Sequence, residues 1–405
     1  MKLLILSILL SLSCLTAGLS QADFEKRIQT ELIMVETGDV VELPPGTFMI
    51  SGSLLMDGKK NVTIKGAGRE KTYLSFSDQQ RGAEGIKITN SENITLEDFT
   101  IQDTKGDCIK VQDTKGITFR NVRAEWTGKA SKKNGAYGLY PVQCEAVLIE
   151  GCEAIGASDA GIYVGQSHQI VVRKSRAYRN VAGIEIENST MADVYENVAE
   201  GNTGGILVFD LPGLIKKKGG NVRVFNNIVS ANNYKNFAPK GNTVGQVAPG
   251  TGILILAASD VEIFDNQIID NKTVGTGILS YFFTEKPIED EDYYPYPARI
   301  SIHDNVYEKG DNGKMQPTWK HKVGFWLYLK FGRKVPNILY DGIVEDDFLD
   351  TNGHLKPEYQ ICLKNNTNGT FLNLNAREDL KSFNTDVTGF ECEQPALKPA
   401  DLVNN

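Results

Sequence analysis

A short phrase recurs along this chain, a small residue followed by apolar residues at alternate positions. The steps between successive copies are 23, 30, 23, 22, 22, 47 and 25 residues. A unit near 22 residues, made of short strands and turns, is typical of a solenoid of stacked β-coils. Each coil repeats the register of the one before, so the repeat also predicts which side chains share a face. The eight copies begin at Gly85, Cys108, Gly138, Gly161, Gly183, Gly205, Gly252 and Gly277.

Two further strands complete each coil. A second strand carries apolar residues at alternate positions, as in Ile94-Thr-Leu96 and Val261-Glu-Ile263, which is the pattern of a strand with one buried face. A third, shorter strand follows. Its inward positions hold Ala124, Ala154, Ala177 and Ala199. Four residues past the centre of the second strand, a stacked inward position predicts a ladder of hydrogen-bonded amides. The ladder residues are Asn197, Asn227, Asn266 and Asn305.

The first 22 residues resemble an export signal and not part of the fold. Lys2 supplies a positive charge, residues 3–12 are apolar, and the small residues Ser20 and Ala22 precede the expected cleavage site. Cys14 offers an alternative, a lipoprotein cleaved before that cysteine, although Ser11 stands where an aliphatic residue is usual. No later run is long and apolar enough to be a transmembrane segment. We therefore expect an exported protein, periplasmic or secreted.

The remaining chain divides into three parts. Residues 23–38 predict a cap helix, because Phe24, Ile28 and Leu32 recur every four residues. Residues 39–308 carry the β-coils, and residues 309–405 form a C-terminal cap or small appended region. Export permits disulfides, and Cys362 and Cys392 in this last part are the candidate pair.

Charge and cysteine spacing exclude several classes of function. The net charge is −8, and no basic tract indicates a nucleic-acid partner. The cysteines and histidines show no zinc-binding spacing, so no metal site is predicted from them.

Several phrases resemble a known architecture. Asn180-Val-Ala-Gly-Ile184 and Asn202-Thr-Gly-Gly-Ile206 are similar to the repeats of carbohydrate-binding and sugar-hydrolase β-helices. Together with the cap helix and the segments 137–143 and 361–366, they make the chain resemble right-handed parallel β-helix proteins of the pectin-lyase-like superfold. The nearest resemblance is to an exported bacterial group to which no activity is assigned. It implies an all-β fold with three strands per coil of roughly 22–25 residues.

The resemblance does not carry an activity with it, because one fold hosts many functions. The Asp-Pro-His-Asp of mannuronan C5-epimerases and the Arg-x-Pro-x-x-Arg of pectate lyases are absent, as are the paired aspartates and Arg-Ile-Lys of polygalacturonases.

The residue type at the outward position of the first strand changes from coil to coil, and this change indicates a candidate site. It reads Lys110, Tyr140, Tyr163 and Glu185 in successive coils, and leucine after that. Tyrosine rings suit the apolar faces of sugars, while Gln and Glu side chains reach their hydroxyls. The leucine-rich half would be an unusually large exposed patch, so we expect the insertions at 211–220, 234–250 and 284–297 to cover it and wall a groove.

This groove predicts polysaccharide chemistry. On a uronate, cations would neutralise the carboxylate while a Tyr, His or Lys base removes the neighbouring proton, giving β-elimination or epimerisation. The catalytic candidates are Tyr140, Tyr163, His168 and Lys110. The substrate-binding candidates are Gln112, Gln143, Glu185, Glu187, Arg173 and Arg176. Glu185 and Glu187 could also hold Ca²⁺ or act as an acid–base pair, and the plainer interpretation is a solvated acidic strand. No other cofactor is expected.

Two functions remain open. The first is an exported lyase or epimerase acting on a polysaccharide. The second is a non-catalytic envelope protein that binds glycan or a protein partner, or a periplasmic maturation factor like the β-helix component of copper-enzyme assembly. The acidic run 289–292, followed by tyrosines and prolines, is either a lid over the groove or, slightly favoured, a solvated excursion.

Overall fold

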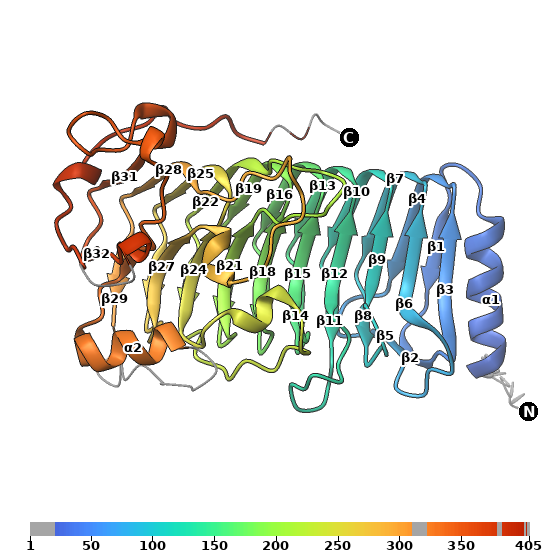
Figure 1. The fold of residues 1–405 in the computed structure, drawn as a ribbon. Coiled ribbons are helices and arrows are strands. Elements are labelled where there is room, and N and C mark those ends of the chain that lie inside the picture. The colour runs from blue at the N-terminus through green and yellow to red at the C-terminus, as the bar shows by residue number, and fades with distance from the viewer. Residues whose placement is uncertain (1–20, 310–321, 379–382, 401, 403–405) are drawn as a thin grey trace, which may run out of the picture.

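The computed structural model describes residues 21–309, 322–378, 383–400 and 402. Three parallel sheets run side by side along the molecule, and the chain passes from one to the next in each coil (Figure 1). This is the predicted parallel β-helix with three strands per coil.

We name the sheets A, B and C. Sheet A contains β1 (Val40–Leu43), β4 (Lys60–Gly66), β7 (Glu92–Glu97), β10 (Lys115–Arg120), β13 (Glu145–Glu150), β16 (His168–Arg173), β19 (Thr190–Tyr195), β22 (Gly220–Phe225), β25 (Ser259–Phe264), β28 (Ala298–His303) and β31 (Ile361–Lys364). Sheet B contains β2 (Gly46–Met49), β5 (Thr72–Ser75), β8 (Thr100–Gln102), β11 (Arg123–Glu125), β14 (Glu153–Ile155), β17 (Arg176–Tyr178), β20 (Val198–Glu200), β23 (Ile228–Ser230), β26 (Gln267–Ile269) and β29 (Val306–Glu308). Sheet C contains β3 (Gly52–Asp57), β6 (Arg81–Thr89), β9 (Ile109–Gln112), β12 (Tyr137–Val142), β15 (Ala160–Gly165), β18 (Ala182–Glu187), β21 (Gly204–Phe209), β24 (Thr251–Leu256), β27 (Val274–Leu279), β30 (Ile338–Tyr340) and β32 (Phe371–Asn373).

The recurring phrase forms sheet C in the expected register. Leu139 on β12 pairs with Ile162 on β15, which pairs with Ile184 on β18, and all three are fully buried. Along each strand, the residues that alternate with these buried ones point outward. Tyr163 therefore lies beside Glu185 on the outer face of the sheet. The register predicted from the repeat is confirmed.

Stacked amides hold neighbouring coils together. The ladder predicted from Asn197 to Asn305 is confirmed, and Asn366 extends it by one coil, because the Asn305 Nδ2 donates to Asn366 Oδ1 at 3.0 Å. A second ladder, which was not predicted, begins where the Asn180 Nδ2 donates to Asn202 Oδ1, also at 3.0 Å. It continues through Asn232 and Asn271. Each buried amide satisfies backbone groups as well as its neighbour.

The N-terminal end is covered by helix α1 (Gln21–Met34), which lies across the first coil (Figure 1). Phe24, Ile28 and Leu32 face the stack and are buried, as the sequence predicts. The expected signal segment, 1–22, and Cys14 fall almost entirely outside the described residues, of which Gln21 is the first.

The β-helix continues past residue 308, where the sequence analysis ended it. Ile338 on β30 pairs with Thr276 on β27, and Ile361 on β31 pairs with Ile300 on β28. A long segment, which includes helix α2 (Lys322–Phe331), separates these strands from the preceding coils. Because the insertion interrupts the 22-residue sequence period, the sequence pattern placed the last coil in the C-terminal region.

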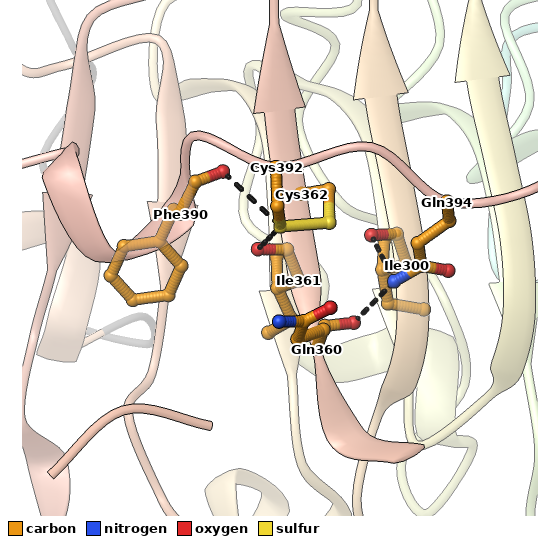
Figure 2. Close-up of a disulfide and its surroundings, with 7 residues drawn as sticks. All are labelled: Ile300, Gln360, Ile361, Cys362, Phe390, Cys392 and Gln394. Atoms are coloured by element: carbon orange, nitrogen blue, oxygen red, sulfur yellow. Dashed lines mark hydrogen bonds between the residues drawn. A yellow bond between two sulfur atoms is a disulfide. The ribbon is translucent and has the colours of Figure 1, made fainter. Parts of the chain in front are cut away.

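A disulfide joins the last strand of sheet A to the chain that follows it. Cys362 on β31 and Cys392 are bonded, which confirms the predicted pair (Figure 2). Beyond the disulfide the chain runs across sheet A. Gln394 donates to the Gln360 carbonyl at 2.8 Å, and the Leu397 N–H donates to Glu262 Oε2 at 3.2 Å. The cysteines Cys108, Cys144 and Cys152 are free and buried.

We expect loss of this disulfide to destabilise the C-terminal coils. The bonded cysteines are 30 residues apart, and closing a loop of that size stabilises the native state by roughly 3–4 kcal/mol. The Cys362→Ser/Cys392→Ser variant should unfold at a lower urea concentration by a corresponding amount. An unchanged midpoint would show that the segment after Cys392 is held on sheet A by its hydrogen bonds alone.

Candidate functional site

Three tyrosines form one aromatic cluster on the outer face of sheet C. The ring of Tyr137 lies 4.5 Å from that of Tyr140 and 4.4 Å from that of Tyr163, between ring centroids. Tyr140 and Tyr163 are 5.0 Å apart and nearly perpendicular. The Lys110 Nζ lies 5.0 Å from the centroid of the Tyr140 ring. Tyr137, Tyr140 and Lys110 are partly exposed, whereas Tyr163 is buried.

Two glutamates of β18 lie beside this cluster. The Tyr163 hydroxyl donates to Glu187 Oε1 at 2.6 Å. Glu185 is 1% exposed, and its Oε2 atom has no hydrogen-bond partner among the described residues. Burial raises the pKa of both glutamates, and the neighbouring Asp159 and Glu187 raise that of Glu185 further. Both side chains are buried, so Glu185 and Glu187 are not the solvated acidic strand of the plainer interpretation.

Two aspartates complete the site, each in the turn before a strand of sheet C. The Tyr137 N–H donates to Asp107 Oδ1 at 3.2 Å, and the Asn242 side chain donates to Asp159 Oδ2 at 2.6 Å. Burial raises the pKa of Asp107 to about 6 and that of Asp159 to about 7. Strand β12 lies between β9 and β15, so the two backbones are separated by two strand spacings, roughly 10 Å.

The apolar half of sheet C is covered, as predicted. Leu207 and Phe209 of β21 are buried beneath Val244 and Val247, which belong to the insertion at 234–250. The same insertion supplies Asn242 to Asp159. It therefore forms a wall at the edge of the tyrosine cluster and holds one of its carboxyl groups.

Not every predicted site residue belongs to this cluster. His168 begins β16 in sheet A, and its Nδ1 atom lies 2.8 Å from the Thr190 hydroxyl. Arg173 forms an ion pair with Glu150 at 2.8 Å on sheet A, and Arg176 pairs with Glu200 at 3.1 Å on sheet B. The prediction that these three join the tyrosines is wrong, because the chain turns into another sheet after Gly165.

Gln112 and Gln143 lie together at the edge of the cluster. The Gln112 side chain donates to Gln143 Oε1 at 3.0 Å, and both residues are partly exposed. They follow the same sheet face as Lys110 and Tyr140, so they remain candidates for contact with a ligand.

The environment of the tyrosines does not suit a general base. Burial, with Asp107, Glu187 and Asp159 nearby, raises the pKa of Tyr140 to about 12. Burial also raises the pKa of Tyr163 well above its ordinary value. A base that works near neutral pH needs a lower pKa. The aspartates, which sequence reasoning did not select, are better placed by their pKa values for proton transfer.

Glu185 and Glu187, which the sequence offers as an alternative Ca²⁺ site, are both buried. Within the described ranges, no group of three or more His, Cys, Asp or Glu side chains is arranged to hold a metal ion.

The acidic and tyrosine-rich insertion packs against the fold and is not a free excursion. Asp290 pairs with Lys217 at 2.6 Å, and the Tyr293 hydroxyl donates to the Asp210 carbonyl at 2.6 Å. Glu289, Glu291 and Asp292 are exposed. Only these acidic residues fit the solvated interpretation, whereas the tyrosines anchor the segment.

We expect the Asp159→Asn substitution to change how stability depends on pH. Asp159 has a pKa of about 7 in the native state and about 3.9 when unfolded, so unfolding releases a proton between these values. The contribution of Asp159 to the free energy of unfolding therefore falls as pH rises from about 4 to 7. Removing the carboxyl should make this slope shallower by up to about 1.4 kcal/mol per pH unit, which is the contribution of one proton.

Urea unfolding at several pH values between 4 and 7 measures this slope. Asp78→Asn, at an exposed position, makes the same chemical change outside the site and should leave the slope as it is. Parallel curves for the wild type and the Asp159→Asn variant would contradict the assignment.

Comparisons with known proteins identify the architecture. Residues 84–238 match the family model described as a right handed beta helix region. The preneck appendage proteins of Bacillus phages PZA and phi29 are each 25% identical over 207 residues, which is 42% of this chain and 24% of the phage protein. The matched part thus spans about a quarter of the length of these curated relatives.

Two solved structures illustrate the likeness in fold. The A-module of mannuronan C-5 epimerase AlgE6 from Azotobacter vinelandii has a TM-score of 0.50 at 15% identity, covering 86% of this chain and 91% of that module. An exopolygalacturonase from Thermotoga maritima has a TM-score of 0.48 at 12% identity, covering 72% of this chain and 83% of that chain. At 15% identity, the AlgE6 module shows a likeness in fold alone. The chain has the right-handed parallel β-helix fold.

No helix in the described part of the chain is long and apolar enough to cross a membrane.

Proposed function

We propose that this protein is a glycan-active enzyme that binds an extended polysaccharide along the outer face of sheet C and cleaves it by hydrolysis. The observation that carries the proposal is the pair Asp107 and Asp159, which flank the tyrosine cluster and have pKa values of about 6 and 7. Burial raises both pKa values toward neutrality, which suits carboxyl groups for proton transfer.

The proposed roles use both carboxyl groups. Asp107 accepts a proton from water, while Asp159, whose pKa burial raises, donates a proton to the oxygen of the leaving sugar. Water then forms the new bond at the anomeric carbon as the glycosidic bond breaks. Inverting hydrolysis needs carboxyl groups roughly 6.5–9.5 Å apart, which leaves room for that water between them.

The cations expected for a uronate are not gathered at this site, which favours a neutral glycan. Lys110 is the cation beside Tyr140. The arginines expected to neutralise a uronate carboxylate are paired with glutamates on other sheets. Tyrosine rings and the Gln112–Gln143 pair then supply stacking and hydrogen bonds to a neutral sugar. A uronate lyase or epimerase with a tyrosine base receives less support, because the pKa of Tyr140 is raised.

A screen of polysaccharides tests the proposal. Neutral glycans such as xylan, mannan and β-glucan should yield new reducing ends, and alginate and polygalacturonate should not. The ultraviolet absorbance of an unsaturated product from either uronate would instead establish a lyase. Protein without detectable binding to any of these glycans would contradict the proposal altogether.

A second candidate is a non-catalytic glycan-binding protein of the cell envelope. It is favoured by the burial of Tyr163 and Glu185 beside the insertion at 234–250. Saturable binding without any product in the screen is its expected result. Both candidates require export, and fractionation of the expressing cells would locate the protein in the periplasm, the medium or the membrane.

A further inference from the structure

A glycine lies in the middle of the tyrosine cluster. Gly165 ends β15, and it lies on the same outer face of sheet C as Tyr163, because residues two apart in a strand share a face. The neighbouring strands place Val142 and Glu187 beside it, so this row of the sheet carries full side chains on both sides. Glycine weakens a strand and often marks a close approach of another group. Its presence here points to a group that takes the space of the missing side chain.

The ring of Tyr163 occupies that space. A methyl group on Gly165 would lie 2.5 Å from the Cζ atom of Tyr163 and closer still to its Cε1 atom and hydroxyl oxygen, well inside van der Waals contact. From this position the Tyr163 hydroxyl donates to Glu187 Oε1 at 2.6 Å. The backbone of Gly165 is ordinary strand without a positive φ, so alanine would suit the backbone. The ring is therefore what excludes a side chain at this position.

Tyr163 cannot move aside without disturbing its neighbours. It is 4% exposed, and its ring centroid lies 4.4 Å from that of Tyr137 and 5.0 Å from that of Tyr140. Glu185 lies beside it on β18. Groups packed this closely transmit a displacement to one another. Because Tyr137 and Tyr140 are the partly exposed members of the cluster, a shift of Tyr163 would change the surface that a ligand meets.

We propose that Gly165 is a positioning residue of the glycan site, which keeps the Tyr163 ring folded onto its own strand and so fixes the surface formed by Tyr137 and Tyr140. This inference rests on the proposed function of the outer face of sheet C. Gly165 acts through the ring and makes no contact with the sugar itself.

Binding of xylohexaose, mannohexaose and cellohexaose, measured by isothermal titration calorimetry on the full chain, tests this role. Gly165→Ala should weaken the Kd of a bound oligosaccharide roughly tenfold or more, because a shifted ring misplaces its neighbours. In a Tyr163→Leu background the same substitution should change the Kd by less than about twofold, since no ring remains to be displaced. Gly128→Ala is the matched control and should keep the wild-type Kd, because no atom lies within 4 Å of a methyl group there.

The ionisation of tyrosine supplies a second readout, which needs no ligand. In the wild type, burial raises the pKa of Tyr163 well above its ordinary value. A ring displaced from Glu187 should ionise near the ordinary pKa of about 10, so an ultraviolet titration of Gly165→Ala should show one more ionising tyrosine than the wild type. The added signal should be absent from the Gly165→Ala/Tyr163→Phe variant. If Gly165→Ala does not fold, the Gly165→Ala/Tyr163→Leu variant should fold, because it removes the overlap.

The outcomes separate this role from the proposed function. An unchanged Kd and an unchanged tyrosine titration in Gly165→Ala would overturn the role of Gly165, as would an equal loss of affinity with and without Tyr163. Wild-type protein that binds none of the three oligosaccharides would instead contradict the proposed function, and with it any role of Gly165 at a glycan site.

Discussion

Replacing Asp159 by asparagine should lower kcat on a neutral glycan by a factor of about 10²–10⁴, the usual contribution of a general acid. Asparagine keeps the size of the side chain but cannot protonate the leaving oxygen. Asp107→Asn should have an effect of similar size, because the attacking water then loses its base. KM should change little in either variant, since the tyrosines that contact the sugar remain. Initial rates of reducing-end release measure both parameters.

Asp78→Asn is again the matched control, because Asp78 is exposed and lies outside sheet C. It should keep wild-type kcat. Wild-type kcat in both site variants would show that Asp107 and Asp159 take no part in the reaction.

The second large effect concerns the asparagine ladder. Asn227 donates its side-chain amide to the carbonyls of Val194 and Phe225, and to Asn266 Oδ1. Its own Oδ1 accepts from the backbone N–H and the side chain of Asn197, both at 3.0 Å. Alanine at this position leaves several buried polar groups unpaired, at about 1–3 kcal/mol each. We expect Asn227→Ala to lose roughly 4 kcal/mol or more of the free energy of unfolding.

The comparison is Ser175→Ala, which removes a shorter polar side chain from the same stacked position. Ser175 Oγ donates to the Arg173 carbonyl and accepts from the Cys152 N–H, so fewer groups lose a partner. Urea unfolding should show a clearly smaller loss than for Asn227→Ala. Equal losses would mean that the side-chain amides of the ladder add nothing beyond the packing of that position.

Much of the fold could be predicted because each coil is a local repeat. The recurring phrase of a small residue followed by alternating apolar residues specifies which residues of sheet C point inward. The ladder from Asn197 to Asn305 follows from the same register. The last coil could not be predicted, because Ile338 and Ile361 follow a long insertion and do not continue the 22-residue phase.

The site could be predicted only where it follows strand alternation. Tyr140, Tyr163 and Glu185 lie on one outer face, as the register requires. His168 is close to Tyr163 in sequence, but the turn after Gly165 places it in sheet A. Asp107 and Asp159 were missed because they precede the strands. Asp107 stands directly before the recurring phrase at Cys108, and Asp159 stands two residues before the copy at Gly161, and this position was the sequence signal that pointed to them.

The contact between Asn242 and Asp159 is long-range and had no sequence signal. The two residues are 83 positions apart. Asn242 belongs to the insertion at 234–250, whose conformation the repeat does not specify. Burial by such insertions also raises the pKa values, so the assignment of an acid and a base required the three-dimensional structure.

The pH dependence of kcat/KM on a neutral glycan distinguishes the carboxyl pair from a tyrosine or lysine base. We expect a bell-shaped profile that rises as Asp107 ionises near pH 6 and falls as Asp159 loses its proton near pH 7. A rate that continues to rise into the alkaline range would instead indicate a tyrosine or lysine base, and would contradict the carboxyl mechanism.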